Sequence, residues 1–123
     1  PSSHRLLLAE DNLINQKVAL QILRVLGYRA DVAQDGEEVL KLLETQSFDL
    51  ILMDVQMPNL DGLEATRIIR LRYPDRNIRI VAMTANAMSS DRDNCLAAGM
   101  DDYLSKPISI LELTRVLGAQ LPH

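Results

Sequence analysis

The stretch that decides the fold is DLILMDVQMPNLDG, residues 49–62. Apolar residues fill positions 50–53, a pattern typical of a strand that is buried on both faces of a parallel sheet. The run ends on the carboxylate of Asp54, and the turn-forming residues Pro58, Asn59 and Gly62 follow shortly after it. This stretch therefore predicts a central strand that presents Asp54 at one edge of a sheet, beside a loop.

Short apolar segments alternate with longer segments of helical periodicity along the rest of the chain. The expected strands are 5–9, 28–33, 49–53, 78–83 and 102–105, and the expected helices are 13–26, 37–46, 63–72, 88–98 and 110–120. Gly27 and Gly99 follow two of these helices, as C-terminal capping residues do. Five strands alternating with five helices predict an α/β fold, a doubly wound parallel sheet covered on both faces. The more polar strands at 28–33 and 102–105 are expected at its edges.

Length and composition indicate one soluble domain over residues 1–123, with 47% hydrophobic and 24% charged residues. The net charge of −4 argues against a nucleic-acid-binding surface. A single cysteine, Cys95, excludes an internal disulfide and fits a reducing, cytoplasmic setting. No apolar run approaches the roughly 20 residues that span a bilayer, so no direct membrane insertion is expected. The first residue, Pro1, suggests a processed chain or a piece of a larger protein.

Polar side chains follow four of the expected strands. Glu10 and Asp11 follow the first strand, Asp54 the third, Thr84 the fourth and Lys106 the fifth. Because the carboxyl ends of parallel strands meet at one edge of a sheet, these side chains are expected to converge there. Two carboxylates ~4 Å apart repel by about 4 kcal/mol at an effective dielectric near 20, so three acids need compensation. Raised pKa values, Lys106 or a bound cation would each supply it.

The types of ligand atom at these positions limit which cation could bind. Oxygen ligands without histidine or cysteine favour Mg²⁺, with Mn²⁺ as an alternative, over Zn²⁺. A nearby hydroxyl and ammonium, from Thr84 and Lys106, suit the remaining oxygens of a phosphoryl group. Taken singly, each of these residues has a structural interpretation, since strand-end Asp, Asn and Thr residues often cap helices or turns. Their joint occurrence at several strand ends favours a site.

Four blocks of this sequence resemble the receiver domains of two-component response regulators, the CheY-like family. The blocks are LLLAEDN (6–12), DLILMDVQMPNLDG (49–62), IVAMTANA (80–87) and DDYLSKPI (101–108). The residues in these blocks are most similar to those of receiver domains in hybrid sensor histidine kinases. The resemblance covers nearly the whole chain and implies a flavodoxin-like (βα)5 fold with strand order 2-1-3-4-5.

The resemblance also implies a role for each residue of the acidic cluster. Asp54 would be the phospho-acceptor. Asp11 and Asp54, with the backbone carbonyl of Gln56, would bind Mg²⁺, and Glu10 would act through metal-bound water. The family often has aspartate where this chain has Glu10, and the longer side chain leaves open whether its contact with the metal is direct.

Further roles follow from the same resemblance. Thr84 and Lys106 would contact the phosphoryl oxygens, and the backbone N–H of Ala85 would add a donor. The Lys106–Pro107 peptide bond would be cis. Thr84 would move towards the phosphoryl group and Tyr103 would then turn inward, which would switch the surface formed by the fourth helix, fifth strand and fifth helix.

The implied function is that of a phosphorelay receiver. Asp54 would take a phosphoryl group from a phosphohistidine of a histidine kinase or phosphotransfer protein, because the sequence has no G-x-x-x-x-G-K-[ST] loop for nucleotide. The domain would catalyse its own phosphorylation and slow autodephosphorylation, tuned by Gln56 and Asn86, while acting as a switch. It is expected to be a monomer or weak dimer, and within a hybrid kinase its parent would be a histidine kinase.

Two surface features leave alternatives open. Ile14 and Val18 in the first helix are either core residues or a docking patch for the partner's helical bundle. Five arginines between the third helix and the fourth strand are either a solvated face or a partner-recognition surface. They are Arg67, Arg70, Arg72, Arg76 and Arg79.

Three other functions would each require residues different from those in this sequence. A metal-dependent phosphohydrolase would need an acid where Gln56 stands, and a flavodoxin-like nucleotide-binding protein would need a Gly/Ser/Thr-rich loop where Glu10 and Asp11 stand. A degenerate receiver that serves only for docking would lack some of the site residues, all of which are present.

Overall fold

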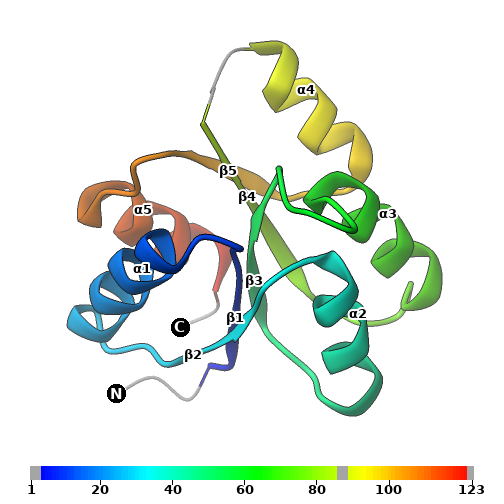
Figure 1. The fold of residues 1–123 in the computed structure, drawn as a ribbon, viewed down its shortest axis with the longest axis horizontal. Helices are drawn as coiled ribbons and strands as arrows, with labels where there is room; N and C mark the ends of the chain where they lie inside the picture. The colour runs from blue at the N-terminus through cyan, green and yellow to red at the C-terminus, as the bar shows by residue number, and fades with distance from the viewer. Residues whose placement is uncertain (1–3, 86–88, 122–123) are drawn as a thin grey trace.

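The structure, a computed structural model, describes residues 4–85 and 89–121 and arranges them as an alternating α/β fold (Figure 1). The strands are β1 Leu6–Ala9, β2 Ala30–Ala33, β3 Leu50–Asp54, β4 Arg79–Thr84 and β5 Asp102–Ser105; the helices are α1 Leu13–Val25, α2 Gly36–Thr45, α3 Gly62–Arg72, α4 Ser89–Ala98 and α5 Ile110–Gln120. All strand pairs are parallel, and the sheet order is β2-β1-β3-β4-β5. The predicted fold class and strand order are confirmed, with β2 and β5 at the edges.

The central strands separate two hydrophobic cores. In β3, Ile51 and Met53 point into the core beneath α2, α3 and α4, whereas Leu50 and Leu52 point into the core beneath α1 and α5. All four side chains are fully buried. Burying each such side chain contributes roughly 1.5–3 kcal/mol, so β3 holds both layers together and fixes the position of the residue at its end, Asp54.

Helix α1 buries a different face from the one that its apolar residues suggested. Gln16, Ala19 and Leu23 are buried, whereas Ile14 and Val18 are 72% and 44% exposed. The small Ala19 lets the helix approach the sheet closely, and the Gln16 Nε2 donates to the Glu10 carbonyl at 2.6 Å, so this polar side chain is satisfied inside. The interpretation of Ile14 and Val18 as core residues is therefore wrong.

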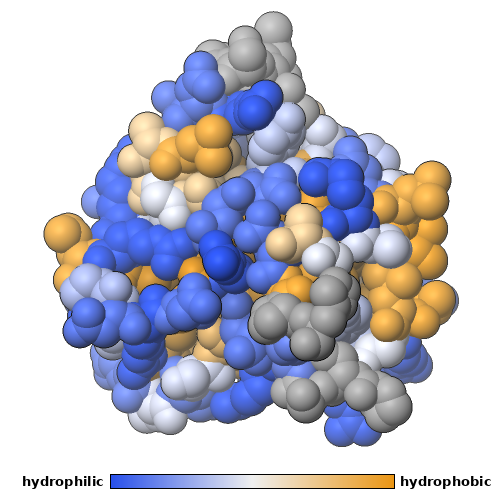
Figure 2. Space-filling model, turned by 180° about the vertical axis from the view of Figure 1, so that it is seen from behind, coloured by the Kyte–Doolittle hydropathy of each residue, from blue (hydrophilic) through white to orange (hydrophobic). Residues whose placement is uncertain are grey.

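The exposed apolar side chains of α1 have counterparts on α5. Seen from behind, hydrophobic residues gather along the edge of the molecule where these two helices lie (Figure 2). Exposed large hydrophobic residues of the two helices are Leu13, Ile14, Val18, Val25, Ile110 and Leu111.

Among the helices that the structure describes, none has the length and apolar character to cross a membrane.

The arginine-rich segment is only partly a solvated face. Arg70 donates to the carbonyls of Ile78 and Gly99 and pairs with Asp101. Arg76 donates to the Leu43 carbonyl at 2.9 Å. These two guanidinium groups satisfy backbone carbonyls at the end of the sheet opposite Asp54, so the solvated-face interpretation is wrong for them.

Asp35 begins α2 and is the centre of a small polar network. Its Oδ1 accepts from the Glu38 N–H at 2.9 Å, and its Oδ2 accepts from the Asn59 side chain at 2.8 Å. The Asn59 hydrogen bond, helped by backbone N–H donors of Glu38 and Glu37 and opposed by burial, lowers the pKa of Asp35 below its ordinary value. The network therefore ties the β3–α3 loop to the start of α2 most strongly when Asp35 is ionised.

Replacing Asp35 by alanine is expected to lower the free energy of unfolding by about 1–2 kcal/mol at neutral pH, because a helix cap and the Asn59 contact are lost. A depressed folded-state pKa means that this contribution is present above about pH 4 and is lost as the pH falls through the folded pKa. Urea unfolding followed by circular dichroism from pH 7 to pH 3 measures the change.

The matched control is Ser109→Ala, which removes the N-cap of α5, whose hydroxyl accepts from the Glu112 N–H at 3.2 Å. A hydroxyl does not titrate in this range, so the cost of this substitution stays constant with pH. A cost of Asp35→Ala that is equally constant would contradict the assignment.

Candidate functional site

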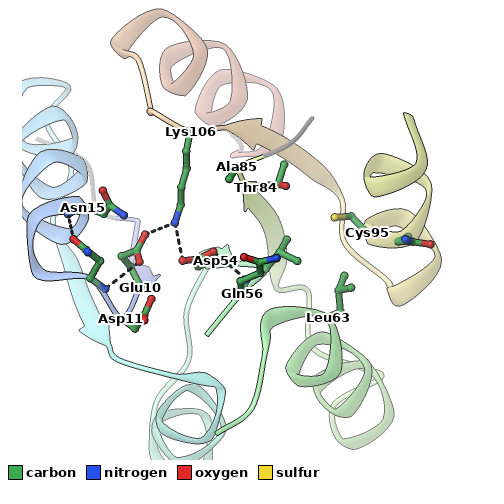
Figure 3. A pocket seen from close by; sticks show the side chains of 13 residues that line it. Glu10, Asp11, Asn15, Asp54, Gln56, Leu63, Thr84, Ala85, Cys95 and Lys106 are labelled. Carbon is green, nitrogen blue, oxygen red and sulfur yellow. Dashed lines mark hydrogen bonds and ion pairs between the residues drawn. The ribbon is translucent and has the colours of Figure 1, made fainter. Parts of the chain in front are cut away.

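The carboxyl ends of β1, β3, β4 and β5 border a cleft of about 470 Å³. All five side chains that the sequence placed at strand ends line it, namely Glu10, Asp11, Asp54, Thr84 and Lys106 (Figure 3). They come from segments that are distant in sequence and meet because every strand of the sheet runs in the same direction. The expected convergence at one edge of the sheet is therefore observed.

Lys106 joins two of the carboxylates. Its Nζ lies 2.7 Å from Asp54 Oδ2 and 2.8 Å from Glu10 Oε1. Burial disfavours the ammonium and by itself lowers its pKa, but the hydrogen bonds and charges of Asp54 and Glu10 outweigh burial and raise the pKa of Lys106. The ammonium stays charged throughout the neutral range, and its contacts weaken only as the pH rises through a pKa above the usual lysine value of about 10.4.

The second oxygen of each buried carboxylate is held by a backbone N–H. Asp54 Oδ1 accepts from the Gln56 N–H, and Glu10 Oε2 accepts from the Asn12 N–H, both at 3.1 Å. Glu10 is 2% exposed and Asp54 is 4% exposed. Both side chains are thus fixed from two sides, which leaves them little freedom to reorient when a ligand enters.

Three carboxylates lie close enough to share a cation. One oxygen each from Glu10, Asp11 and Asp54 lies within 4.8 Å of the others. Glu10 and Asp54 are buried, whereas Asp11 is exposed and leaves one side of the cluster open to water. An oxygen-only donor set with room for retained water suits Mg²⁺, so the residues present fit the metal that the sequence indicated.

The remaining predicted residues lie around the same cleft. Thr84, 7% exposed, ends β4, and its carbonyl accepts from the Lys106 N–H at 2.8 Å. Gln56 and Ala85 line the cleft, and the Lys106–Pro107 peptide bond is cis, as expected. Asn86, which was expected to tune dephosphorylation, lies outside the described residues.

Tyr103 lies on the edge strand β5 and is half-buried. The Arg92 guanidinium from α4 sits over its ring, 5.5 Å from the centroid. A cation over an aromatic face contributes about 0.5–1 kcal/mol at an exposed site. The aromatic side chain is thus held against α4, partly open to solvent.

Sequence reasoning missed one wall of the cleft. Leu63 from α3 and Cys95 from α4 line the cleft on the side opposite Glu10. Cys95 is 2% exposed, and its proximity to the site was not anticipated from the sequence. The sequence carried no signal for it, because the position of α4 against the sheet depends on tertiary packing.

A close approach beneath Asp54 was also missed. A methyl group added to Gly62 would lie 2.2 Å from the Asp54 carbonyl oxygen, and the Gly62 N–H donates to the Val55 carbonyl at 3.0 Å. The first residue of α3 therefore packs directly against the end of β3. The glycine was visible in the sequence as part of a turn, but this contact was not.

Comparison with known proteins shows which family this sequence matches. The family model described as "Response regulator receiver domain" matches residues 6–117. Hybrid signal transduction histidine kinase K of Dictyostelium discoideum is 41% identical over 126 residues, which cover 97% of this chain and 10% of the kinase. The chain spans a tenth or less of the length of this and two other curated relatives that it matches.

Two solved structures are similar along almost the whole chain. The receiver domain of a sensor histidine kinase from Pseudomonas aeruginosa PAO1, with a magnesium ion coordinated in its active-site cleft, has a TM-score of 0.87 at 47% identity and covers 97% of this chain and 98% of its own. The receiver domain of Ssk1 from Saccharomyces cerevisiae, crystallised with the histidine phosphotransfer protein Ypd1, has a TM-score of 0.89 at 30% identity and covers 95% and 88%.

Proposed function

The chain belongs to the response regulator receiver domain family, whose members act in two-component phosphorelays, and we propose that Asp54 is its phospho-acceptor. The observation that carries this proposal is the position of Asp54. It is a buried carboxylate at the end of the central strand, paired with Lys106 and within 4.8 Å of two further acids. The single domain is proposed to extend over residues 1–123.

The proposed reaction transfers a phosphoryl group from a phosphohistidine to Asp54. An Asp54 carboxylate oxygen attacks phosphorus as the phosphorus–nitrogen bond to the imidazole breaks, and the imidazole leaves with the bonding electron pair and takes up a proton. Lys106 offsets the negative charge of nucleophile and phosphoryl group as they approach. The same oxygen, bonded to phosphorus, is later released when water attacks the acyl phosphate.

The metal would be held by Asp11 and Asp54, by the Gln56 carbonyl and by Glu10 through water. A bound Mg²⁺, or Mn²⁺ in its place, supplies charge neutralisation between the acidic cluster and the phosphoryl oxygens. Support comes from the oxygen-only cluster and from the magnesium ion in the similar Pseudomonas receiver. Thr84 and the Ala85 N–H are the proposed donors to the other phosphoryl oxygens, because both lie on the cleft.

Switching is proposed to run through Thr84 and Tyr103. Movement of Thr84 towards the phosphoryl group would open space for the Tyr103 ring, which would have to leave its contact with Arg92. The bound phosphoryl group shifts this equilibrium only by the difference in free energy of its contacts in the two states. The affected surface comprises α4, β5 and α5.

The proposed partner is a histidine kinase or a histidine phosphotransfer protein. Ile14 and Val18 are exposed near the start of α1, beside the acidic cleft, where an apolar patch on a helical bundle could meet them. The complex of the Ssk1 receiver with Ypd1 supports this class of partner. A parent hybrid histidine kinase for this chain is likewise a proposal, supported by kinase relatives such as that from Dictyostelium.

Beryllofluoride, which mimics a phosphoryl group on a carboxylate, tests the proposed function. Adding beryllofluoride and Mg²⁺ to the isotope-labelled chain should shift the NMR signals of Asp54, Thr84 and Tyr103, and removal of Mg²⁺ by a chelator should reverse the shifts. The absence of Mg²⁺-dependent shifts near Asp54 would contradict the proposal.

Replacing Lys106 by alanine is expected to have opposite effects on two measurable steps. Phosphotransfer from a phosphohistidine donor should slow by about 10²-fold, because a charge that stabilises the transition state is lost. Mg²⁺ affinity should rise several-fold, because the ammonium that lies 2.7 Å from Asp54 and 2.8 Å from Glu10 no longer competes with the metal for these carboxylates. Quenched time-course assays of phosphotransfer and NMR titration with MgCl₂ measure the two effects.

The control is Lys41→Ala, at an exposed position of α2, which should leave both quantities unchanged. A parallel loss of Mg²⁺ affinity and phosphotransfer in Lys106→Ala would show instead that Lys106 is needed to arrange the carboxylates.

A further inference from the structure

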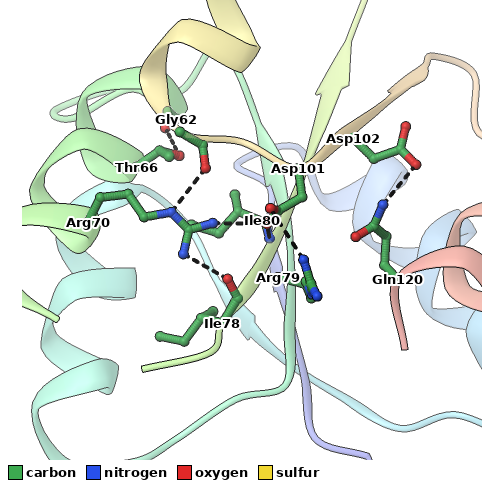
Figure 4. Close-up of polar contacts among 10 residues, drawn as sticks. Gly62, Thr66, Arg70, Ile78, Arg79, Ile80, Asp101, Asp102 and Gln120 are labelled. Atoms are coloured by element: carbon green, nitrogen blue, oxygen red, sulfur yellow. Dashed lines mark hydrogen bonds and ion pairs between the residues drawn. The ribbon is translucent and has the colours of Figure 1, made fainter. Parts of the chain in front are cut away.

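A second polar network lies at the end of the sheet opposite Asp54 (Figure 4). Arg70, in the last turn of α3, uses all three guanidinium nitrogens. Its Nη1 donates to the Ile78 carbonyl at 2.8 Å, its Nε donates to the Gly99 carbonyl at 3.0 Å, and its Nη2 pairs with Asp101 Oδ2 at 2.9 Å. A planar guanidinium with three fixed partners is held in one orientation.

Asp101 continues the network into the sheet. Its Oδ2 also accepts from the Ile80 N–H at 2.9 Å, and its own N–H donates to the Ile80 carbonyl at 2.7 Å. Arg79 adds a longer ion pair to Oδ1 at 3.7 Å. The residue that precedes β5 is thereby attached to β4 through both its backbone and its side chain.

The network secures the C-terminal end of α4. Gly99, with φ of 108°, ends this helix in a left-handed conformation, and the Met100 N–H donates to the Cys95 carbonyl at 3.1 Å. A methyl group on Gly99 would lie 2.9 Å from the Arg70 Cγ, so the side chain of Arg70 lies directly against this turn. Ala98 and Met100, on either side of the glycine, are each 4% exposed.

The part of α4 closer to the cleft, residues 92–95, is mostly exposed. Arg92, Asp93 and Asn94 are exposed, and Cys95 is the buried residue among positions 92–95. The Arg92 contact with the Tyr103 ring is a surface contact worth little free energy. Over residues 92–101, the buried side chains therefore begin at Cys95, and the hydrogen bonds of Arg70 to Gly99 and Asp101 lie at the C-terminal end.

We propose that Arg70 and Asp101 are positioning residues of the switch, which hold the C-terminal end of α4 and the start of β5 on the sheet while the rest of α4 moves. This inference rests on the proposed function of Asp54. A helix of ten residues is about 15 Å long, so a small rotation about Gly99 produces a large displacement at the end near the cleft. The network converts a local change at Asp54 into a directed movement of α4 and Tyr103.

Amide hydrogen exchange with and without beryllofluoride and Mg²⁺ tests the proposal. In the wild type, exchange at residues 92–95 and 103 should change on binding, whereas exchange at residues 98–101 should change less than twofold. Arg70→Met retains the aliphatic contact with Gly99 but removes the three polar contacts. In this variant exchange at residues 98–101 should rise about tenfold, and the shift of the Tyr103 ring signal at saturation should fall by at least half.

Two further variants separate positioning from general stability. Asp101→Asn keeps the shape of the side chain and should give the same pattern more weakly. Arg76→Met is the matched control, since Arg76 donates to the Leu43 carbonyl and lies away from α4. It should lower stability without altering the exchange pattern or the response of Tyr103.

Occupancy is followed independently by the fluorine NMR signal of bound beryllofluoride. A wild-type response that is as large at residues 98–101 as at 92–95, or Arg70→Met and Asp101→Asn variants that respond like the wild type at equal occupancy, would overturn the positioning role alone. Failure of the fluorine signal to appear in the wild type would instead overturn the function proposed for Asp54.

Discussion

Asp54→Asn is expected to reduce phosphorylation of the chain by a phosphohistidine donor by at least about 10³-fold, to the limit of detection. The amide that replaces the carboxylate has no nucleophilic oxyanion, so no acyl phosphate can form. Asparagine is nearly the same size as aspartate and retains an oxygen for Lys106, which lies 2.7 Å from Asp54 Oδ2 in the wild type. The fold should therefore persist, and loss of one of three neighbouring acids should leave the stability unchanged or slightly higher.

Intact-mass measurement of the phosphorylated chain, with and without hydroxylamine, checks this expectation. Hydroxylamine should remove the added phosphoryl group from the wild type, as it does from acyl phosphates. Asp61→Asn is the matched control, because it makes the same chemical change seven positions later, at the N-cap of α3, where asparagine also caps well. An adduct of wild-type size on Asp54→Asn would show that a different side chain, such as Asp11, accepts the phosphoryl group.

Gly62→Ala is expected to lower the free energy of unfolding by about 3 kcal/mol. The new methyl carbon would lie 2.2 Å from the Asp54 carbonyl oxygen and 2.8 Å from the Met53 Cγ. Both neighbours belong to the fully buried central strand, where no flexible side-chain end can move aside. Relief of the overlap requires α3 to move away from β3, which would also displace Asp54 from Lys106 and slow phosphotransfer.

Urea unfolding followed by circular dichroism measures this effect, and Gly118→Ala provides the matched control. Gly118 lies inside α5 with nothing within 4 Å of an added methyl group, so alanine there should increase stability by about 0.5–1 kcal/mol. The same substitution is thus expected to lower the free energy of unfolding at one helical position and to raise it at another. A cost below about 1 kcal/mol for Gly62→Ala would mean that the β3–α3 junction is looser than this packing indicates.

The sequence by itself determined the layers of the fold and the position of Asp54. Residues 50–53 are apolar without interruption and are followed by turn-forming residues, a pattern typical of a strand with both faces covered. Parallel strands bring their carboxyl ends together, so residues that follow different strands meet at one edge of the sheet. This is why Glu10, Asp54 and Lys106 could be grouped before any contact between them was known.

The resemblance to a known family supplied the strand order and the roles of individual residues, which the local sequence pattern does not give. Strand order 2-1-3-4-5 does not follow from alternation alone, because several orders of parallel strands satisfy the same pattern of strands and helices. The roles assigned to Thr84 and Tyr103 came from the same source. The structure brings Thr84 to the cleft and leaves Tyr103 half-buried beneath Arg92, an arrangement compatible with the proposed switch.

Only the tertiary structure decided which face of each helix is buried and what the polar side chains on it bind. In α1, residues 16, 19 and 23 and residues 14, 18 and 25 both follow helical spacing, and close packing on the sheet favoured the set with the small Ala19. Arg70 looks like any surface arginine in the sequence, yet its partners at 78, 99 and 101 are brought to it by the chain's return through β4, α4 and β5. Local sequence sets helical and strand periodicity, whereas contacts between distant segments depend on how whole elements pack, and that is settled only when the sheet and its helices are assembled.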